Sequence, residues 1–291
     1  MPKFSKIRKA IFPVGGLGTR FLPATKSIPK EMLPVVDKPL IQYAVEEALE
    51  AGIEEFIIIT GRGKSAIENY FDHSIELEKN LLDKGNVENL NLINRTILKP
   101  GTVSFIRQQS PLGLGHAVWC ARNFISDEPV AVILPDDLIE AKPGCMKQMI
   151  ENWDGGNMVA TMNVEDKDIS SYGIITPGKI IREKIEIHGI VEKPEPKNAP
   201  SNIAVVGRYI IQPSVFEDLA LQKKGTNDEI QLTDSLSSQI GKAPFYAYNF
   251  IGTRYDCGTK IGFTKANTNF ALKDDEIGKE YNDWLSSLLK N

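Results

Sequence analysis

The sequence has 291 residues, of which 42% are hydrophobic and 25% charged, and this composition excludes collagen-like, low-complexity and disordered proteins. Lys and Arg total 34 against 38 Asp and Glu, which gives a net charge of −4, so no overall basic field exists to attract nucleic acid or an anionic membrane. The three cysteines, Cys120, Cys145 and Cys257, are widely spaced and form no CxxC, which argues against a disulfide framework and a structural zinc site. We therefore expect a cytoplasmic protein with neither nucleic acid nor a membrane as a partner.

Short apolar runs alternate with helical patterns through the first half of the chain, which is typical of a parallel sheet with crossover helices. Strands are predicted over residues 10–14, 55–60, 103–107 and 130–134. A helix is predicted to open near Pro39 and to end at Gly52. Its apolar face consists of Ile41, Val45, Ala48 and Leu49. Another helix is expected to start near His116, and residues 65–90 predict one or two further helices.

Beyond residue 157 the pattern changes to short alternating stretches, at 174–176, 180–191 and 203–211, which predict mixed or antiparallel strands. Such strands are common in the substrate-binding additions to α/β sheets. In the tail, the residues at helical spacing are Ile277, Tyr281, Trp284, Leu285 and Leu288. They predict a C-terminal helix over residues 273–291. We expect this apolar stripe to pack on its own chain; a contact with another subunit is the alternative.

A glycine-rich segment follows the first predicted strand and contains Gly15, Gly16 and Gly18. Glycines allow backbone N–H groups to turn toward a polyphosphate, although a glycine-rich stretch on its own is also typical of a flexible turn. The proline-stiffened stretch that continues to residue 34 adds Arg20 and Lys30. Cations so close to a glycine loop suit a nucleoside triphosphate, whose charges need both dipoles and full positive charges.

Two familiar phosphate-binding motifs are excluded by spacing. A dinucleotide-binding GxGxxG motif that begins at Gly16 would need a third glycine where Phe21 stands. A P-loop that ends in Gly63-Lys64-Ser65 would need its first glycine at Ile58, inside a predicted strand.

The whole run from residue 14 to residue 34 resembles the signature of the sugar nucleotidyltransferases, and within them that of the uridylyltransferases that act on glucose 1-phosphate. Further segments match this family in order along almost the entire chain, at residues 107–108, 113–117, 134–137, 172–173, 191–194, 229–234 and 255–258. The resemblance implies an α/β fold with a Rossmann-like mixed sheet flanked by helices, a smaller β-rich sugar-binding portion and a C-terminal helix. We expect a single domain over residues 1–291, with a soft division near residue 157 between a nucleotide-binding half and a sugar-phosphate-binding half.

The implied reaction joins UTP to glucose 1-phosphate and gives UDP-glucose and pyrophosphate, with Mg²⁺ as the cofactor. The attacking phosphate monoester is already an anion at pH 7, because its second pKa is about 6, so the reaction needs no general base. His73, His116 and His188 accordingly receive no catalytic role. The difficulty is to bring two polyanions together, which requires a metal ion and cationic side chains along the line of attack.

The resemblance assigns the charged groups of this reaction. Arg20 and Lys30 would face the triphosphate as catalytic cations, and Lys193 would hold the phosphate of glucose 1-phosphate. Asp136 and Asp256 would hold the Mg²⁺, an ion that prefers one or two carboxylates together with substrate oxygens and water. Taken singly, each aspartate is also typical of a helix cap or a turn. Asp136, however, follows a predicted buried strand, where ligands bind in open α/β sheets.

The remaining assignments concern recognition of the two substrates. The residues assigned to the nucleotide are Gly15, Gly16, Leu17, Gly18, Thr19, Glu31, Gln108, Gly113 and Asp136. Those assigned to the sugar phosphate are Asp137, Tyr172, Gly173, Glu192 and Lys193. Gln108 and the Gly113 backbone would match the uracil edge, which has one N–H donor between two carbonyl acceptors. An exposed amide at a strand end is the alternative for Gln108.

Glu192 and Lys193 pose a geometric question, because successive side chains of a strand point in opposite directions. Both can face one sugar phosphate only where the chain bends, and Pro194 favours the end of the strand there. The alternative is an exposed ion pair, which contributes little.

Two other functions stay open. A sister enzyme would use dTTP or another sugar 1-phosphate, because one methyl group is discriminated by only about 1 to 3 kcal/mol. A nucleotide sensor would keep the fold without the chemistry, although the complete set of charged residues argues against it. The family is commonly oligomeric, so we expect a homo-oligomer, either a dimer or a tetramer.

Overall fold

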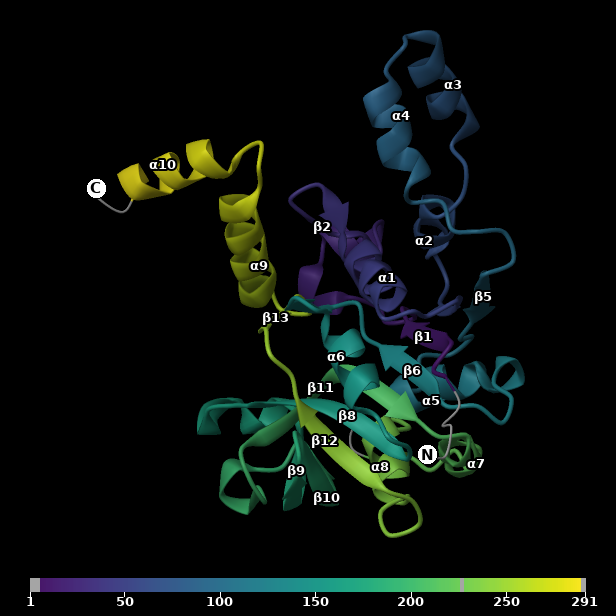
Figure 1. The fold of residues 1–291 in the computed structure, drawn as a ribbon, viewed down its shortest axis with the longest axis vertical. Coiled ribbons are helices and arrows are strands. Elements are labelled where there is room, and N and C mark those ends of the chain that lie inside the picture. Colours follow the sequence, from purple (N-terminus) through teal and green to yellow (C-terminus); the bar gives the residue numbers. More distant parts are fainter. Residues whose placement is uncertain (1–5, 226–227, 289–291) are drawn as a thin grey trace.

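The computed structural model describes residues 6–225 and 228–288 of the chain, and Figure 1 shows its fold. A mixed sheet forms the centre of the molecule. Its nine strands within the described residues are β1 (Lys9–Pro13), β4 (Glu55–Thr60), β5 (Val103–Arg107), β6 (Val130–Ile133), β8 (Asn157–Asn163), β9 (Gly173–Ile181), β10 (Lys184–Glu192), β11 (Ile203–Ile211) and β12 (Phe245–Asn249). Across the sheet they lie in the order β5-β4-β1-β6-β11-β8-β12-β10-β9.

Helices and two short ladders surround this sheet. The ladders pair β2 (Pro34–Val35) with β3 (Lys38–Pro39) and β7 (Asp137–Glu140) with β13 (Thr253–Asp256). The helices are α1 (Leu40–Glu50), α2 (Ser65–Tyr70), α3 (Ile75–Asp83), α4 (Val87–Asn94), α5 (Leu114–Cys120), α6 (Cys145–Asn152), α7 (Ser214–Leu219), α8 (Leu232–Ser237), α9 (Lys260–Lys273) and α10 (Gly278–Leu288). Figure 1 shows that α3 and α4 stand away from the sheet and that α10 extends from another side of the molecule. No helix in the described part of the chain is long and apolar enough to cross a membrane.

Two hydrophobic clusters cover the sheet from opposite faces. Phe12 belongs to one cluster, together with Ile41 of α1 and Met149 of α6. Ile11, its neighbour in β1, belongs to the other cluster, together with Val118 of α5. Successive residues of a strand point to opposite faces, and full burial of one such side chain contributes about 1.5–3 kcal/mol. The continuous apolar strands therefore form because helices cover both of their faces.

The order of the strands brings several loops to one edge of the sheet. β5, β4, β1 and β6 are parallel neighbours, as the alternating pattern predicts. β11 then runs antiparallel to both β6 and β8, so the mixed sheet implied by the resemblance is confirmed. Because the carboxyl ends of parallel strands share one edge, the loops that follow β1, β4, β5 and β6 lie together there.

The predicted boundaries are confirmed for five strands. β4, β5 and β11 coincide with their predicted ranges, and β1 and β6 lie within one residue of theirs. The predicted stretches 174–176 and 180–191 are wrong in their bounds, because the chain turns between Ile181 and Lys184 and forms β9 and β10 there. The helix expected near His116 is α5, which begins two residues earlier. The prediction of one or two helices over residues 65–90 is wrong, because the chain forms α2, α3 and α4 and continues to Asn94.

The predicted apolar face of α1 is wrong at one residue, Leu49. Leu49 is 50% exposed, whereas Ala44 is 2% exposed. Eight residues along an α-helix rotate a side chain by about 80°, so Leu49 lies at the edge of the stripe that Ile41 begins. The helix otherwise starts after Pro39 and is followed by Gly52 in a left-handed conformation (φ 82°), as predicted.

The C-terminal helix is present but shorter than predicted. It begins at Gly278, and residues 289–291 of the predicted range lie outside the described residues. Asp274 ends α9, and its carboxylate accepts hydrogen bonds from the backbone N–H groups of residues 276 and 277, which turns the chain away from the body. Trp284 and Leu288 are 53% and 55% exposed. The expectation that this stripe packs on its own chain is therefore wrong for these residues.

Candidate active site

Two cavities open where the parallel strands end. The first, which we call the glycine-loop cavity, has a volume of about 460 Å³. The second, the Tyr172 cavity, has a volume of about 330 Å³. Asp136 lines both of them, as do Leu114, Leu134 and Glu229, so the two cavities adjoin.

Every site residue predicted from the sequence lines one of these cavities or both. The glycine-loop cavity is lined by Gly15, Gly16, Leu17, Gly18, Thr19, Lys30, Glu31, Gln108, Gly113 and Asp136. The Tyr172 cavity is lined by Arg20, Asp136, Asp137, Tyr172, Gly173, Glu192, Lys193 and Asp256. The fold thus brings together residues from widely separated parts of the chain.

Tight turns return Lys30 to the glycine loop. Gly18 takes a left-handed conformation (φ 66°), and its carbonyl oxygen accepts a hydrogen bond from Thr25 Oγ1 at 2.7 Å. Short 3₁₀ turns follow at Thr19–Phe21, Ala24–Lys26 and Lys30–Met32. A Cβ atom on Gly16 would lie 4.0 Å from Lys30 Nζ, so the ammonium group lies directly beside the backbone of the loop.

Lys30 and Asp136 form an ion pair, with 2.5 Å between Nζ and Oδ2. Burial acts to lower the pKa of Lys30, but the carboxylates of Asp136 and Glu31 outweigh it, and the pKa lies above its usual value. Burial likewise acts to raise the pKa of Asp136, but the Lys30 ammonium outweighs it, and the pKa lies below its usual value. Both groups are therefore charged at neutral pH.

Asp256 reaches the same place from far along the chain. The ladder of β13 with β7 sets Asp256 opposite Asp137. A Cβ atom on Gly258 would lie 3.0 Å from Asp136 Oδ2 and 3.0 Å from Asp256 Oδ1, so the two carboxylates face one small gap. Burial raises the pKa of Asp256 against the opposing effect of the Arg254 guanidinium, and the carboxylates of Asp137 and Asp136 raise it further. A cation between the two carboxylates would relieve this repulsion.

Asp137 supports the wall of the Tyr172 cavity. It is buried, and its Oδ2 accepts a hydrogen bond from the backbone N–H of Gly207 at 2.7 Å. Its Oδ1 accepts one from Arg254 Nε at 2.9 Å, and Arg254 Nη1 in turn donates to the Tyr172 hydroxyl at 2.8 Å. Arg254 was not among the residues predicted from the sequence. Arg254 and Asp256 are two residues apart, so in a strand their side chains lie on one face. A strand predicted over these residues would have placed Arg254 beside the site.

The chain bends where Glu192 and Lys193 require it. β10 ends at Glu192, and Lys193 takes a left-handed conformation (φ 47°), so both side chains line the Tyr172 cavity. Lys193 Nζ lies 3.3 Å from Glu192 Oε1, and the Glu192 side chain is only 11% exposed. Glu192 Oε2 also accepts a hydrogen bond from Thr233 Oγ1 at 2.7 Å. Thr233 was not singled out from the sequence, although it lies in the matched segment 229–234.

Gln108 closes the other end of the site. It is 7% exposed, so the alternative of an exposed amide is wrong. Its Nε2 donates to the Gly113 carbonyl oxygen at 3.2 Å. Gly113 has a φ of 109°, and a Cβ atom there would lie 2.7 Å from the Ile230 carbonyl oxygen. Only glycine fits this close approach of two backbone segments.

A buried ion pair lies beside the glycine loop. Lys64 Nζ is 2.7 Å from Glu31 Oε2, and the two residues are 7% and 1% exposed. Burial raises the pKa of Glu31 against the opposing effect of the Lys64 and Lys30 ammonium groups. Lys64 was not among the predicted site residues; the sequence marked it only as part of an excluded P-loop.

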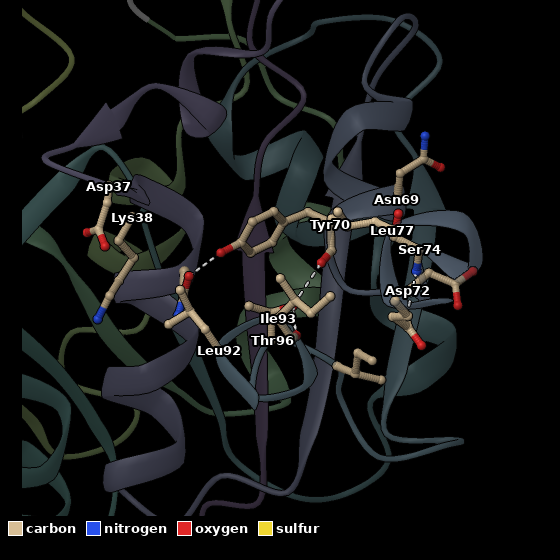
Figure 2. A pocket seen from close by; sticks show the side chains of 13 residues that line it. Asp37, Lys38, Asn69, Tyr70, Asp72, Ser74, Leu77, Leu92, Ile93 and Thr96 are labelled. Carbon is tan, nitrogen blue, oxygen red and sulfur yellow. Dashed lines mark hydrogen bonds between the residues drawn. The ribbon is translucent and has the colours of Figure 1, made fainter. Parts of the chain in front are cut away.

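A third cavity, of about 350 Å³, shares no lining residue with the first two. Figure 2 shows Tyr70, Leu92 and Ile93 among the side chains that line it. Tyr70 donates a hydrogen bond to Gln42 Oε1 there. None of the predicted site residues lines this cavity, so the candidate site is the adjoining pair.

Comparison with known proteins identifies the family of this chain. The family model described as "Nucleotidyl transferase" matches residues 9–272. The chain is 46% identical over 286 residues to the UTP–glucose-1-phosphate uridylyltransferase of Bacillus subtilis (strain 168), an alignment that covers 98% of each chain.

Solved structures similar to this chain come from the same family. A UDP-glucose pyrophosphorylase complexed with UDP-glucose is 44% identical, with a TM-score of 0.82 and coverage of 92% of this chain and 100% of that chain. The UTP-bound UGPase from Acinetobacter baumannii is 40% identical, with a TM-score of 0.89 and coverage of 97% and 99%. Because the family model matches residues 9–272 and the Bacillus subtilis relative is 46% identical over nearly its full length, this chain belongs to the nucleotidyl transferase family.

Proposed function

We propose that this chain transfers the uridylyl group of UTP to glucose 1-phosphate, with UDP-glucose and pyrophosphate as products. The observation that carries the proposal is the junction of the two cavities at Asp136, where Lys30 also lies. A nucleotide in the glycine-loop cavity and a sugar phosphate in the Tyr172 cavity would meet there. The names of the similar proteins, a UTP–glucose-1-phosphate uridylyltransferase and a UDP-glucose pyrophosphorylase, support the choice of substrates.

The charges at the junction suit the attack of one phosphate on another. Lys193 would hold the phosphate of glucose 1-phosphate, whose oxygen attacks the α-phosphorus of UTP while pyrophosphate leaves in line. Arg20 and Lys30 would neutralise the triphosphate. The attacking oxygen is already anionic at pH 7, so no side chain has to remove a proton.

Asp136 and Asp256 would hold a Mg²⁺ ion, which supplies further positive charge at the phosphates when it is bound. Their carboxylates face one gap, and the described residues contain no cluster of three or more His, Cys, Asp or Glu that could hold a metal ion. Such a donor set suits Mg²⁺, which takes its other ligands from substrate oxygens and water. Arg20 lies next to the gap, since its Nη1 donates to the Gly258 carbonyl oxygen at 3.4 Å.

Recognition of base and sugar would fall to opposite ends of the site. Gln108 and the Gly113 backbone would read the uracil edge, and Glu192 would accept hydrogen bonds from sugar hydroxyls beside Gly173. The nucleotide side would then come from the chain before residue 157 and most of the sugar side from the chain after it. This arrangement supports a single domain with two functional halves.

The test is the release of pyrophosphate with Mg²⁺ over a grid of UTP, dTTP, ATP and GTP against glucose 1-phosphate and other sugar 1-phosphates. We expect a sharp maximum at UTP with glucose 1-phosphate. A maximum with another nucleotide or another sugar 1-phosphate would contradict the proposed substrates, and the type of reaction would stay as proposed. Nucleotide binding without release of pyrophosphate from any pair would favour a sensor.

We also expect a homo-oligomer, either a dimer or a tetramer, that works in the cytoplasm. The exposed Trp284 and Leu288 on α10 support a contact with a second copy. Light scattering on the purified protein measures its mass in solution, and the mass of a single chain would contradict this expectation.

A further inference from the structure

The side-chain amide of Gln108 has a fixed orientation. Its Nε2 lies 3.2 Å from the carbonyl oxygen of Gly113 and 3.0 Å from Nδ1 of His116. A carbonyl oxygen only accepts hydrogen bonds, so the NH₂ group faces Gly113. Both amide hydrogens are then in use, and Oε1 is left on the side of the glycine loop. A Cβ atom on Gly15 would lie 2.6 Å from this oxygen.

His116 accepts the second amide hydrogen. Because an NH₂ group of an amide only donates, Nδ1 carries a lone pair and the ring proton lies on Nε2. Cys120 Sγ lies 4.0 Å from the same Nδ1, and burial raises the pKa of that thiol, so the thiol keeps its proton and is compatible with a lone pair on Nδ1. Burial lowers the pKa of His116, and the Arg122 guanidinium lowers it further, so the ring is neutral at neutral pH.

We propose that His116 is a positioning residue for base selectivity, whose Nδ1 holds Gln108 so that Oε1 is presented to the nucleobase. The inference rests on the proposed function, in which Gln108 reads the pyrimidine edge. Uracil and thymine carry a hydrogen on N3, which matches an acceptor. Cytosine has a lone pair on N3, which an acceptor repels. His116 thereby excludes cytosine without touching the nucleotide.

The consequence of losing Nδ1 follows from the same contacts. Without it, only the Gly113 carbonyl holds the amide, and one hydrogen bond leaves Gln108 free to rotate and to present Nε2 to the base. Two substitutions separate the acceptor from the volume of the side chain. Asparagine places Oδ1 at the same bond separation from Cα as Nδ1 of histidine, whereas leucine places a methyl group there.

The experiment compares kcat/KM for UTP, dTTP and CTP, each with glucose 1-phosphate, in the wild type and three variants. In His116→Leu we expect the ratio of UTP to CTP to fall about tenfold or more. In His116→Asn, which keeps an acceptor, we expect this ratio to stay within about threefold of the wild type. The same holds for Cys120→Ala, the control one helical turn away. The ratio of UTP to dTTP should stay unchanged throughout, because both bases carry the N3 hydrogen. A merely structural role for His116 would lower all three rates together.

A second arm tests whether His116 acts through Gln108. In a Gln108→Ala background we expect His116→Leu to have no further effect on the ratio of UTP to CTP. An unchanged ratio in the active His116→Leu enzyme, or an equal loss in both backgrounds, overturns the inference alone. Absence of turnover in the wild type with every nucleotide overturns the proposed function and the inference with it.

A measurement on the wild type does not depend on the folding of His116→Leu. Long-range ¹H–¹⁵N spectra of the protein with ¹⁵N-labelled histidine distinguish the two ring tautomers. The spectra of His73→Asn and His188→Asn assign the other two histidines, whose side chains are 59% and 55% exposed. We expect His116 to carry its proton on Nε2 at neutral pH. A proton on Nδ1 overturns the inference, because Nδ1 then cannot accept from Gln108.

Discussion

At the scale of single residues, Lys30 combines an ion pair with a position beside the glycine loop. Its ammonium lies 2.5 Å from Asp136 Oδ2, and one preorganised charge of this kind supplies about 3 to 4 kcal/mol to a transition state. We therefore expect Lys30→Ala to lower kcat by about 10²- to 10³-fold while unfolding stays cooperative. Steady-state kinetics with UTP and glucose 1-phosphate checks this. The control is Lys26→Ala, an exposed lysine of the same stretch that lines neither cavity. Near-normal turnover in Lys30→Ala would remove Lys30 from the mechanism.

Asp136 makes the stability of the fold depend on pH. Burial opposes its ionisation, but the Lys30 ammonium outweighs burial, so its pKa lies below the ordinary value of 3.8. A carboxyl with a depressed pKa stabilises the fold above its unfolded-state value and loses that contribution as the pH falls through its folded-state value. We expect wild type to exceed Asp136→Asn in free energy of unfolding by a constant amount at neutral pH, and the difference to narrow below pH 3.8. Urea unfolding at a series of pH values measures it. A difference that widens in acid would contradict the assigned direction.

At the scale of elements, a buried ion pair holds the turn between β6 and β7. Arg208 of β11 is 1% exposed, and its Nη2 lies 2.7 Å from Glu47 Oε2 of α1. The same guanidinium donates to the carbonyl oxygens of Leu134 at 3.1 Å and Asp137 at 2.9 Å. A strand and a helix therefore fix the turn that carries Asp136.

This network predicts a large loss of stability from one substitution. We expect Arg208→Met to lower the free energy of unfolding by about 3–5 kcal/mol, because the Glu47 carboxylate stays buried without its partner. Adding Glu47→Leu removes that charge and should restore part of the loss. The surface control is Lys6→Ala, whose pair with Glu54 joins side chains that are 62% and 44% exposed and is worth about 1 kcal/mol or less. Urea unfolding of these variants measures the free energies. If Arg208→Met lowers the free energy of unfolding as little as the control does, the network does not stabilise the fold.

The same scale shows why some elements were predictable and others were not. β4 and β11 are mostly apolar, with Arg208 the one charged residue inside β11, so their local pattern located both of their ends. β7 and β13 are short, and their pairing joins distant parts of the chain. Arg254 reaches Asp137, 117 positions away, only through that pairing, so its local spacing to Asp256 does not reveal this contact. The direction of α10 likewise depends on the few residues after α9, and its apolar stripe alone does not encode it.

At the scale of the whole molecule, one sheet connects both cavities. The glycine loop follows β1, whereas Lys193 follows β10 at the other side of β11, β8 and β12. The sequence motifs identified the residues of the site, because the spacing within each motif is local. These residues lie close together in space because of the strand order, which no local pattern predicts. A ligand that bridges the cavities therefore contacts both parts of the sheet.

A ligand that contacts both cavities should stabilise the fold differently from a ligand that occupies one cavity. A ligand at 100 times its Kd adds about 2.7 kcal/mol to the free energy of unfolding, so UDP-glucose and UMP should each raise Tm. UMP would occupy only the glycine-loop cavity, whereas the sugar-bearing phosphate of UDP-glucose would contact Lys193. At fixed ligand concentration, we expect Lys193→Ala to shrink the Tm shift caused by UDP-glucose and to leave the shift caused by UMP unchanged.

Differential scanning calorimetry makes this comparison on the wild type, on Lys193→Ala and on Lys197→Ala, a control lysine whose side chain is 77% exposed. The control should keep both shifts. A ligand that binds only the folded state stabilises it by an amount that grows with the logarithm of its affinity, so losing a contact with one phosphate lowers the Tm shift of only the ligand that carries that phosphate. Equal losses of both shifts in Lys193→Ala would mean that Lys193 supports the fold of the whole site, and would contradict its assignment to the sugar phosphate.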